Sequence, residues 1–385
     1  MRSIIILLSA VLLISCQEEV LEFTPTEKFN SIFDNPSEGL NFAPLDIMET
    51  EEGGFLVLSE LANGSIFILK VTNRGDFQWS EQLSTQFQNP VASMVQRAGE
   101  YYFMAGTAPQ NTATIFKIND LNQNIEAARI YNGYRKPLAF SALGESDYLL
   151  LSFNDTTGTV LSKIQEGFAM EWARKFDELE NAHQLLQAYE NNNRSDFFVG
   201  SLNAGGIIYF NSLRDNGVNL TYTNDLGIET GRIRTGQRNM INSFVPDNAG
   251  GIAVNYILNG QPYFINNYDP VANDSVNLQV VGGRIQEDRL TIQKAISTSI
   301  TIGSFEYVIN AYTTLNGRIK LNFYDTATGN QVAIKYLGGI DPLQVIKLIP
   351  TADEGLAILS RITIAGAKER INVVKIPKSE LLNLL

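Results

Sequence analysis

Short apolar stretches that open with a turn residue recur along the chain at a nearly constant interval. The pattern reads GGFLVLSE from Gly53, GEYYFMAGT from Gly99, ESDYLLLSF from Glu145 and RSDFFVGSL from Arg194. It continues as GGIAVNYI from Gly250, SFEYVINAY from Ser304 and DEGLAILSR from Asp353. The equivalent positions are Phe55, Tyr102, Tyr148, Phe197, Ile252, Tyr307 and Leu356. Their spacings of 47, 46, 49, 55, 55 and 49 residues indicate seven repeats of one structural unit.

A second series of positions supports the same repeat. Each unit continues with a short loop and another apolar strand that ends in lysine or asparagine. These residues are Lys70, Lys117, Lys163, Asn211, Asn266, Asn322 and Lys375. A polar turn follows each of them, in most units with a further strand, and one more strand precedes each turn-led stretch. Four short strands in roughly 50 residues is the size of a propeller blade.

The expected fold is therefore all-β, a seven-bladed β-propeller of four-stranded antiparallel blades, with counts of six and eight left open. A single four-stranded sheet exposes its edges and buries one face poorly, so the units are expected to stack face to face around an axis. The expected units span residues 42–85, 91–131, 137–176, 183–223, 240–281, 291–337 and 344–385.

The last unit lacks an outer strand, because only Ile376 to Leu385 remain after Lys375. We expect the stretch Val20 to Ile32 to supply that strand and lock the ring. The tail Pro377 to Leu381 is predicted as a short helix with proline near its start. Asp177 to Glu190 has helix-compatible apolar spacing, but the repeat requires a loop and then a strand there, and we expect the strand.

The first fifteen residues have the pattern of a signal peptide. Arg2 supplies a positive charge, and Ile4 to Ile14 form an apolar stretch too short to span a membrane. The run Leu13-Ile14-Ser15-Cys16 resembles the bacterial lipoprotein signal, which implies that residues 1–15 are removed and that Cys16 is lipidated. An ordinary secretory signal with a chance cysteine is the alternative.

Two further likenesses point to one group of bacteria. Gln17-Glu18-Glu19 resembles the acidic signal that follows the lipidated cysteine in surface-exposed lipoproteins of the Bacteroidota. The turn-led strands resemble the degenerate propeller repeats of lipoproteins from that phylum. The resemblance implies an outer-membrane protein at the cell surface, with a periplasm-facing anchor left open. Residues 16–40 are then the lipidated N-terminus, tether and closing strand, and residues 41–385 the propeller.

Charge and cysteine content narrow the function. The chain has 29 basic and 41 acidic residues and a net charge of −12. Such an acidic chain repels phosphate backbones, so nucleic acid is not an expected partner. Cys16 is the only cysteine, which excludes an intrachain disulfide and any cysteine-based metal site.

Candidate catalytic and metal-binding residues are few. His183 is the only histidine, lies in a polar stretch and has no GxSxG motif beside it. Asp120-Leu121-Asn122-Gln123-Asn124 opens like a calcium loop, but Ile125 replaces the glycine and Tyr131 the bidentate acid. A plain polar turn explains this segment better. We expect no metal and no cofactor.

The inter-blade links carry the best candidates for binding. In a propeller, these links and the turns between second and third strands share one face. The links hold the arginines Arg135, Arg232, Arg234, Arg238, Arg284 and Arg289. Long loops on one face of a rigid ring are a usual place for binding. The alternative is that these arginines pair with local acids such as Glu229 and Asp288.

Three loop sites resemble the Asp-Ser/Thr-apolar acceptor of Bacteroidota O-glycosylation. The candidate acceptors are Thr156, Ser275 and Thr326. Together with the signal and the repeat, the sequence favours a lipid-anchored, non-catalytic binding or scaffold module with a protein or glycan partner. The second hypothesis is a carbohydrate-active enzyme that uses a pair of carboxylates at the propeller centre.

Overall fold

The computed structural model describes thirteen stretches of the chain. These are residues 28–34, 41–154, 158–176, 184, 186–187, 197–202, 206–214, 217–236, 239–247, 250–269, 272–291, 293–364 and 368–385. Cys16 and the expected signal over residues 1–15 lie outside them. None of the described helices has both the length and the apolar character needed to cross a bilayer.

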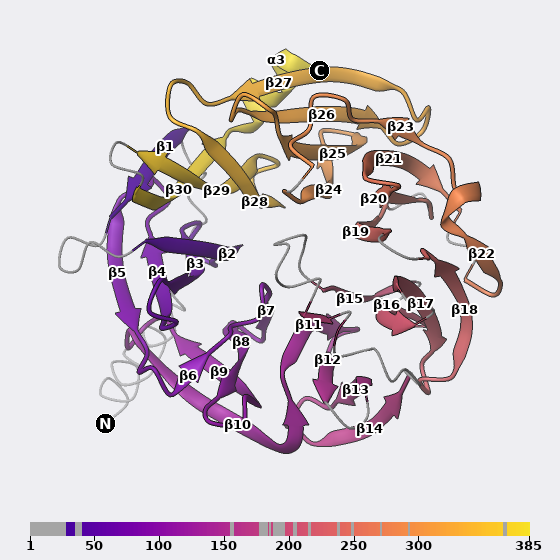
Figure 1. Ribbon diagram of the computed structural model, residues 1–385. Coiled ribbons are helices and arrows are strands. Elements are labelled where there is room, and N and C mark those ends of the chain that lie inside the picture. The colour runs from indigo at the N-terminus through magenta and orange to yellow at the C-terminus, as the bar shows by residue number, and fades with distance from the viewer. Residues whose placement is uncertain are drawn as a thin grey trace, which may run out of the picture.

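The described strands form six sheets arranged around a common axis (Figure 1). The first contains β2 (Phe42–Glu49), β3 (Phe55–Leu61), β4 (Ile66–Val71) and β5 (Phe77–Gln82). The second contains β6 (Phe87–Gln88), β7 (Met94–Arg97), β8 (Glu100–Thr107), β9 (Thr112–Asn119) and β10 (Asn124–Arg135). The third contains β11 (Pro137–Leu143), β12 (Asp147–Asn154), β13 (Gly158–Ile164) and β14 (Met170–Lys175).

The fourth sheet has nine strands and the last two have four each. The nine-stranded sheet contains β15 (Val199–Leu202), β16 (Ile207–Arg214), β17 (Gly217–Asn224), β18 (Glu229–Arg234), β19 (Met240–Pro246), β20 (Ile252–Leu258), β21 (Gln261–Tyr268), β22 (Ser275–Asn277) and β23 (Arg284–Ile285). Next come β24 (Ala295–Ile302), β25 (Phe305–Thr313), β26 (Ile319–Asp325) and β27 (Gln331–Leu337). The sixth sheet contains β28 (Leu343–Pro350), β29 (Leu356–Ile364), β30 (Lys368–Ile376) and β1 (Phe29–Phe33), and helix α3 (Lys378–Leu384) follows it.

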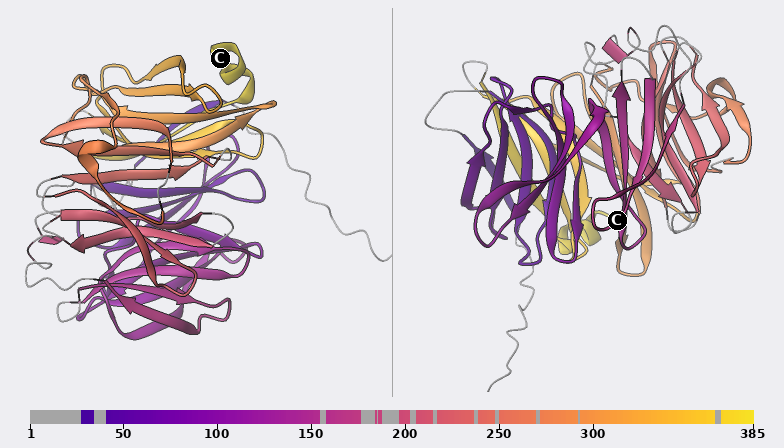
Figure 2. Two further views of the ribbon diagram at one scale, coloured as in Figure 1. Left: turned by 90° about the vertical axis from the view of Figure 1, so that its right-hand side faces the viewer. Right: turned by 90° about the horizontal axis from the view of Figure 1, so that it is seen from below.

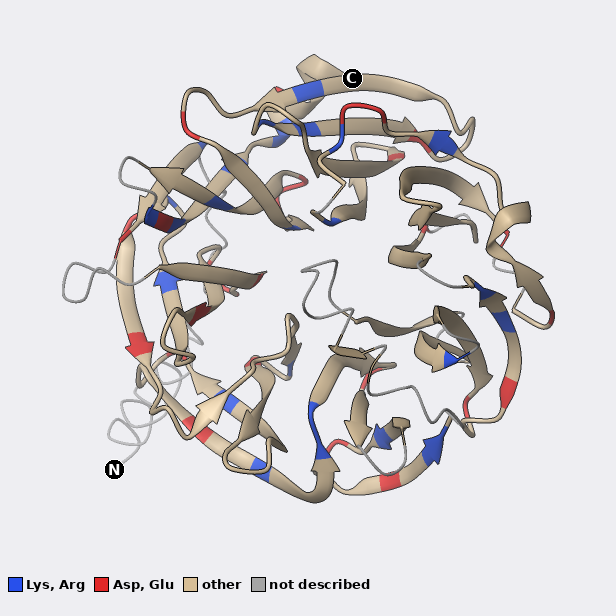
Figure 3. Ribbon diagram, viewed as in Figure 1, with Lys and Arg blue, Asp and Glu red and all other residues tan. Residues whose placement is uncertain are grey.

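The hydrophobic core lies between the sheets. β3 and β4 are buried along almost their whole length, whereas the outer strand β5 is mostly exposed. One apolar cluster joins Phe55 and Val57 to Leu359 and Val373 of the sixth sheet. Charged residues gather on the outer strands and the turns (Figure 3). Burial of both faces of the central strands therefore holds neighbouring sheets together.

In two sheets, the lysine of the second repeat series contacts the turn that precedes the apolar stretch of the first series. Lys70 Nζ donates to Thr50 Oγ1 at 2.9 Å, and a Cβ on Gly54 would lie 2.5 Å from Val71 O. In the sixth sheet, Lys375 donates to Thr351, and a Cβ on Gly355 would lie 2.5 Å from its Nζ. The glycine is needed because the lysine strand passes where a side chain would be. The lysine in turn binds the turn between the first two strands.

The ring is closed by the N-terminal strand. β1 pairs antiparallel with β30, with Phe29 opposite Lys375 and Phe33 opposite Ile371. Asn372 Nδ2 donates to Asn30 Oδ1 at 2.6 Å. Phe29 packs edge to face on Phe55, with ring centroids 6.0 Å apart. The sixth sheet thus takes its outer strand from the segment before the first repeat, where the sequence places it.

The predicted helix at the C-terminus is confirmed. α3 begins directly after Pro377, whose backbone is extended and which occupies the N-cap position. Leu381 on α3 is fully buried and packs among the apolar residues of the last two sheets. The helix therefore covers the outer side of the ring near its closure.

The prediction of a strand from residue 183 onward is wrong. Gln184, Leu186 and Gln187 are helical, and Leu186 is fully buried against the third and fourth sheets. β15 pairs with β16 and also contacts β11, the innermost strand of the third sheet. The stretch around Phe197 therefore leads into β15, the first strand in the order β15–β16–β17, whereas the repeat predicts a second strand there. The described residues in this stretch follow the helical spacing of apolar residues instead of the repeat, because the helix buries Leu186.

The fifth unit also departs from the expectation. The outer strand was expected before residue 281, but β22 pairs in parallel with β18 of the preceding group of strands. The strand beside β21 is β23, which pairs only through Arg284 and Ile285. Leu278, in a short 3-10 helix over Leu278–Val280, is buried beside Tyr222 and Tyr256. Leu278 therefore adds an apolar contact between β17 and β20.

Ring closure leads to a stability prediction for Phe29. We expect Phe29→Ala to lower the free energy of unfolding by about 2 kcal/mol, because it removes a partly buried ring that packs on Phe55. Urea unfolding followed by tryptophan fluorescence measures the change. The control is Phe77→Ala on β5, whose side chain is 60% exposed and whose loss should cost less than about 0.5 kcal/mol. Equal effects of the two substitutions would contradict a closing role for β1.

Candidate functional site: the link face

The ring has two faces, because the strands of each sheet alternate in direction. Turns between second and third strands and the links to the next sheet lie at one end, which we call the link face. Turns between first and second strands lie at the other end, the hairpin face. Contacts define the link face directly: Leu343 N donates to Gly317 O at 2.8 Å, joining a link to a second-to-third turn.

Three of the predicted arginines lie at the link face. Arg135 pairs with Thr112, next to the β8–β9 turn. Arg234 precedes Thr235, whose N–H donates to Asn219 Oδ1 near the start of β17. Arg289 forms a bridge with Thr314, directly after β25.

The remaining predicted arginines are placed differently. Arg232 and Arg284 pair at mid-strand, with Thr221 and Phe264, and so lie below the face. Arg232 Nε donates to Glu229 Oε1 at 3.0 Å, which is the local pairing that the sequence left as an alternative. The Arg284 guanidinium lies over the ring of Tyr324, 5.6 Å from its centroid. Arg238 lies outside the described residues.

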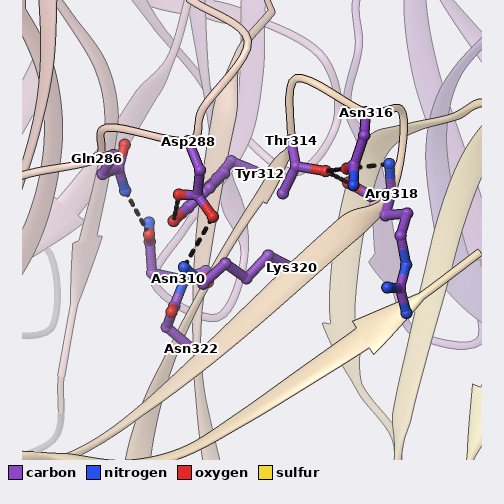
Figure 4. Close-up of polar contacts among 9 residues, drawn as sticks. All are labelled: Gln286, Asp288, Asn310, Tyr312, Thr314, Asn316, Arg318, Lys320 and Asn322. Carbon is purple, nitrogen blue, oxygen red and sulfur yellow. Dashed lines mark hydrogen bonds and ion pairs between the residues drawn. The ribbon is translucent and has the colours of Figure 1, made fainter.

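A buried polar seam fixes the link between β23 and β24 (Figure 4). Gln286 from the link donates through Nε2 to Asn310 Oδ1 at 2.6 Å. Asn310 Nδ2 donates to Asn255 Oδ1 at 2.7 Å, and Asn255 Nδ2 donates to Ser297 Oγ at 2.8 Å. These four side chains are at most 6% exposed. Satisfied polar networks of this kind hold one geometry, so the link is fixed in place.

The seam was missed at the sequence level, although one signal for it exists. In three sheets a buried serine on the second strand faces a bulge of the first strand: Ser59, Ser152 and Ser360. Asn255 on β20 likewise pairs beside a bulge of β19, whereas Asn310 on β25 pairs with Ser297 where the register is unbroken. A polar residue inside an otherwise apolar second strand is therefore the sequence signal for a buried polar contact with the first strand.

Arg289 places a positive charge beneath the link face. Its side chain is 2% exposed, and it donates to Gln286 Oε1 at 3.0 Å and to Gln293 O at 2.9 Å. Burial lowers the pKa of Arg289 to about 10. The guanidinium is therefore still charged at neutral pH.

Asp288 is held at the same edge by two donors. Tyr312 OH donates to Oδ1 at 2.6 Å, and Lys320 Nζ donates to Oδ2 at 2.9 Å (Figure 4). Burial raises the pKa of Asp288, but these two hydrogen bonds outweigh it, and the net pKa is lowered. Asp288 is therefore ionised at neutral pH and ties the link to β25 and β26.

Two exposed apolar side chains stand on the link face beside the seam. Leu315 is 68% exposed on the turn after β25, and Ile340 is fully exposed on the link to β28. Leu315 N donates to Asp288 O at 2.9 Å, and a Cβ on Gly317 would lie 3.0 Å from Pro342. The turn and the link are therefore adjacent. Isolated exposed side chains follow no periodic pattern, so the sequence does not reveal them.

The other predicted sites have varied surroundings. Ser275 is exposed, whereas the Thr326 hydroxyl is buried and donates to Glu306 O at 3.1 Å. Thr156 lies outside the described residues, and O-glycosylation stays a prediction. Asp120 accepts from Lys70 Nζ at 2.5 Å and from Trp79 Nε1 at 3.0 Å. These hydrogen bonds give the aspartate of the calcium-like turn a structural role.

Carboxylates near the axis are held by backbone groups. Asp46 on β2 accepts from Met94 N at 2.5 Å and lies 3.1 Å from Lys347 Nζ, so it joins three neighbouring sheets. Glu49, at the end of the same strand, accepts from Ala352 N at 2.7 Å, and burial raises its pKa. Among the described first strands these are the two acids, and both bind neighbouring sheets.

Comparison with known proteins gives a fold and no family. No protein-family model and no curated protein matches the chain. The Saccharomyces cerevisiae core factor structure resembles it with a TM-score of 0.54 at 8% identity, over 95% of this chain and 63% of that one. The WD40 domain of Toxoplasma gondii coronin gives 0.45 at 9% identity, over 74% and 70%. A variant of AofleA from Arthrobotrys oligospora with three arginines changed to alanine gives 0.45 at 11%, over 91% and 89%.

These likenesses concern the fold alone, since none exceeds 11% identity. The radial four-stranded antiparallel sheets and their repeat define an all-β propeller with degenerate repeats (Figure 1).

The geometry of Asp288 predicts how stability depends on pH at this site. The pKa of Asp288 is lower in the folded chain, so its ionised form stabilises the fold above the unfolded pKa of about 3.9. That contribution is lost as the pH falls through the folded pKa. We expect Asp288→Asn to destabilise by about 1 kcal/mol at pH 7, after solvent screening, and by much less near pH 3.

Urea unfolding at both pH values measures this difference. The exposed neighbour Glu287, changed to Gln, is the control and should shift stability by less than about 0.5 kcal/mol. A penalty for Asp288→Asn that stays the same at both pH values would contradict the role of its charge.

Proposed function

We propose that the protein is a lipid-anchored cell-envelope β-propeller that acts as a non-catalytic binding or scaffold module. Cys16 carries the lipid, the outer membrane is its location, and the cell surface is the side on which the ring is displayed. The partner is a protein or a glycan that docks on the link face. The proposal combines the lipoprotein-like N-terminus with the arginines and apolar side chains of a rigid face.

We further propose that the ring has seven blades. The nine-stranded sheet then counts as two blades, β15 to β18 and β19, β20, β21 with β23. Support comes from the pairing between these groups, which consists of the single bridge Val218–Met240 and the short β18–β22 contact. Each group also has the first-to-fourth order seen in the other sheets.

The observation that carries the binding role is the exposure of Arg135 and Arg234 on a fixed face of an acidic chain. The carboxylates on the innermost strand β2, Asp46 and Glu49, are engaged by the backbone N–H groups of Met94 and Ala352. Glycoside hydrolysis uses two carboxyl groups that flank the scissile bond. The described residues therefore favour binding over catalysis on carbohydrate.

The anchor is tested by Cys16→Ser. We expect this variant to leave the membrane fraction and to lose palmitate labelling, because the thiol is the proposed acceptor of the lipid. Fractionation of cells fed labelled palmitate measures both. Ser15→Ala, which keeps the cysteine and a small residue before it, is the control and should stay labelled. Labelling that persists in Cys16→Ser would refute lipidation at this residue.

The binding role is tested by charge reversal on the link face. We expect Arg135→Glu with Arg234→Glu to reduce the recovered complex about tenfold, because two exposed positive charges become negative. Native electrophoresis of the detergent-solubilised membrane protein measures the complex. The control is Arg74→Glu, an exposed arginine in the β4–β5 turn on the hairpin face. A wild-type chain that always migrates alone and binds no glycan on an array would overturn the proposal.

A further inference from the structure

The closing strand fixes the face at which the tether enters the ring. Phe29, the first residue of β1, lies opposite Lys375 at the end of β30, beside helix α3. Lys28 forms an ion pair with Glu380 of that helix, with Nζ and Oε2 2.7 Å apart. The chain then runs along β1 toward Phe33, which lies opposite Ile371. Since β30 ends at the hairpin face, the tether enters there.

The link face therefore points away from the tether. Twelve residues separate Cys16 from Phe29, which span at most about 45 Å when fully extended. Because the segment joins the ring at its hairpin face, we take that face as the one nearer to the membrane. The opposite ends of the last two sheets lie on the far side of the ring from α3 (Figure 2).

On that far side, Leu315 and Ile340 form what we call the apolar strip. Leu343 N donates to Gly317 O at 2.8 Å, and Thr363 N donates to Pro342 O at 3.0 Å, so three elements meet there. Leu315 is 68% exposed and Ile340 is 101% exposed. Large aliphatic side chains at adjacent loop tips are poorly solvated by water, and their burial by a partner is favourable.

Basic residues border the apolar strip. Arg318 ends the turn after β25, and its guanidinium lies over Tyr336, 5.0 Å from the ring centroid. Lys368 is exposed at the start of β30. Asp341 adds one negative charge beside Ile340. The chemistry is that of a protein interface, an apolar centre with a charged rim, because aliphatic side chains offer sugar hydroxyls no hydrogen bond.

We infer that the apolar strip docks a protein partner on the side of the ring that faces away from the membrane. The partner presents an apolar pocket bordered by carboxylates that meet Arg318 and Lys368. This inference rests on the proposed lipid anchor, which sets the orientation. It also narrows the proposed partner from protein or glycan to protein.

The test is photocrosslinking of the full-length chain in its own membrane. A photoreactive phenylalanine analogue replaces Leu315 or Ile340, and the control position is Phe305. Phe305 is 61% exposed on the β24–β25 turn of the same sheet as Leu315, but at the hairpin face. We expect one protein adduct of the same mass from positions 315 and 340 and none from position 305.

A second arm tests the chemistry of the contact. Lys368→Glu in the labelled chain should reduce the adduct about tenfold, because the rim charge then repels the partner's carboxylates. Leu315→Ser with Ile340→Ser should remove the native complex without changing unfolding, since both side chains are exposed. Phe305→Ser should keep the complex.

Three results would overturn the inference: equal adducts at positions 305 and 315, lipid adducts alone, or a charge reversal without effect. Failure of the anchor is seen separately, because fractionation of the same cells shows whether the chain is on the membrane. An adduct at position 315 in a chain found in the soluble fraction would refute both the lipid anchor and the proposed orientation.

Discussion

Closure of the ring by one short strand is the constraint on which the other features depend. A stack of four-stranded sheets buries its faces only if the last sheet meets the first, and an unpaired outer edge would stay open. β1 meets both requirements, because it completes the sheet of β28 to β30 and places Phe29 on Phe55 of the next sheet. It also connects the ring to whatever precedes residue 28. The same five residues therefore complete the last sheet and fix the end of the ring at which the preceding chain enters.

Within this ring, the first and sixth sheets solve the same packing problem in the same way. A glycine leaves room for the third strand, and a buried lysine donates to the turn beside it, as at Gly54 with Lys70 and Gly355 with Lys375. Polar residues that face first-strand bulges complete the interior. Between β23 and β24, Gln286 and Arg289 extend this polar interior into the link. The link face is rigid there because its loops are hydrogen-bonded to the core.

Repeat, strand content and ring closure could all be predicted, because each depends on the local order of turn, glycine and apolar residues. The prediction failed where a local detour replaced a repeat element. Leu186 is buried from a helix, and β22 pairs with a neighbouring group of strands, since each buries apolar surface that the regular pattern would leave exposed. Arg135, Arg234 and Arg289 lie at the link face, whereas Arg232 lies at mid-strand and pairs locally with Glu229. The burial of Arg289 depends on Thr314, a neighbour that is distant along the chain.

The sequence by itself determined the class of fold and the segment that closes the ring, because period, glycine and chain order are one-dimensional properties. Only the tertiary structure decided which side chains reach solvent on the link face. Arg289 and Leu315 both lie in polar surroundings along the chain, but the first is buried and the second exposed. Exposure is fixed by contacts between distant segments, and these exist only once the sheets have stacked.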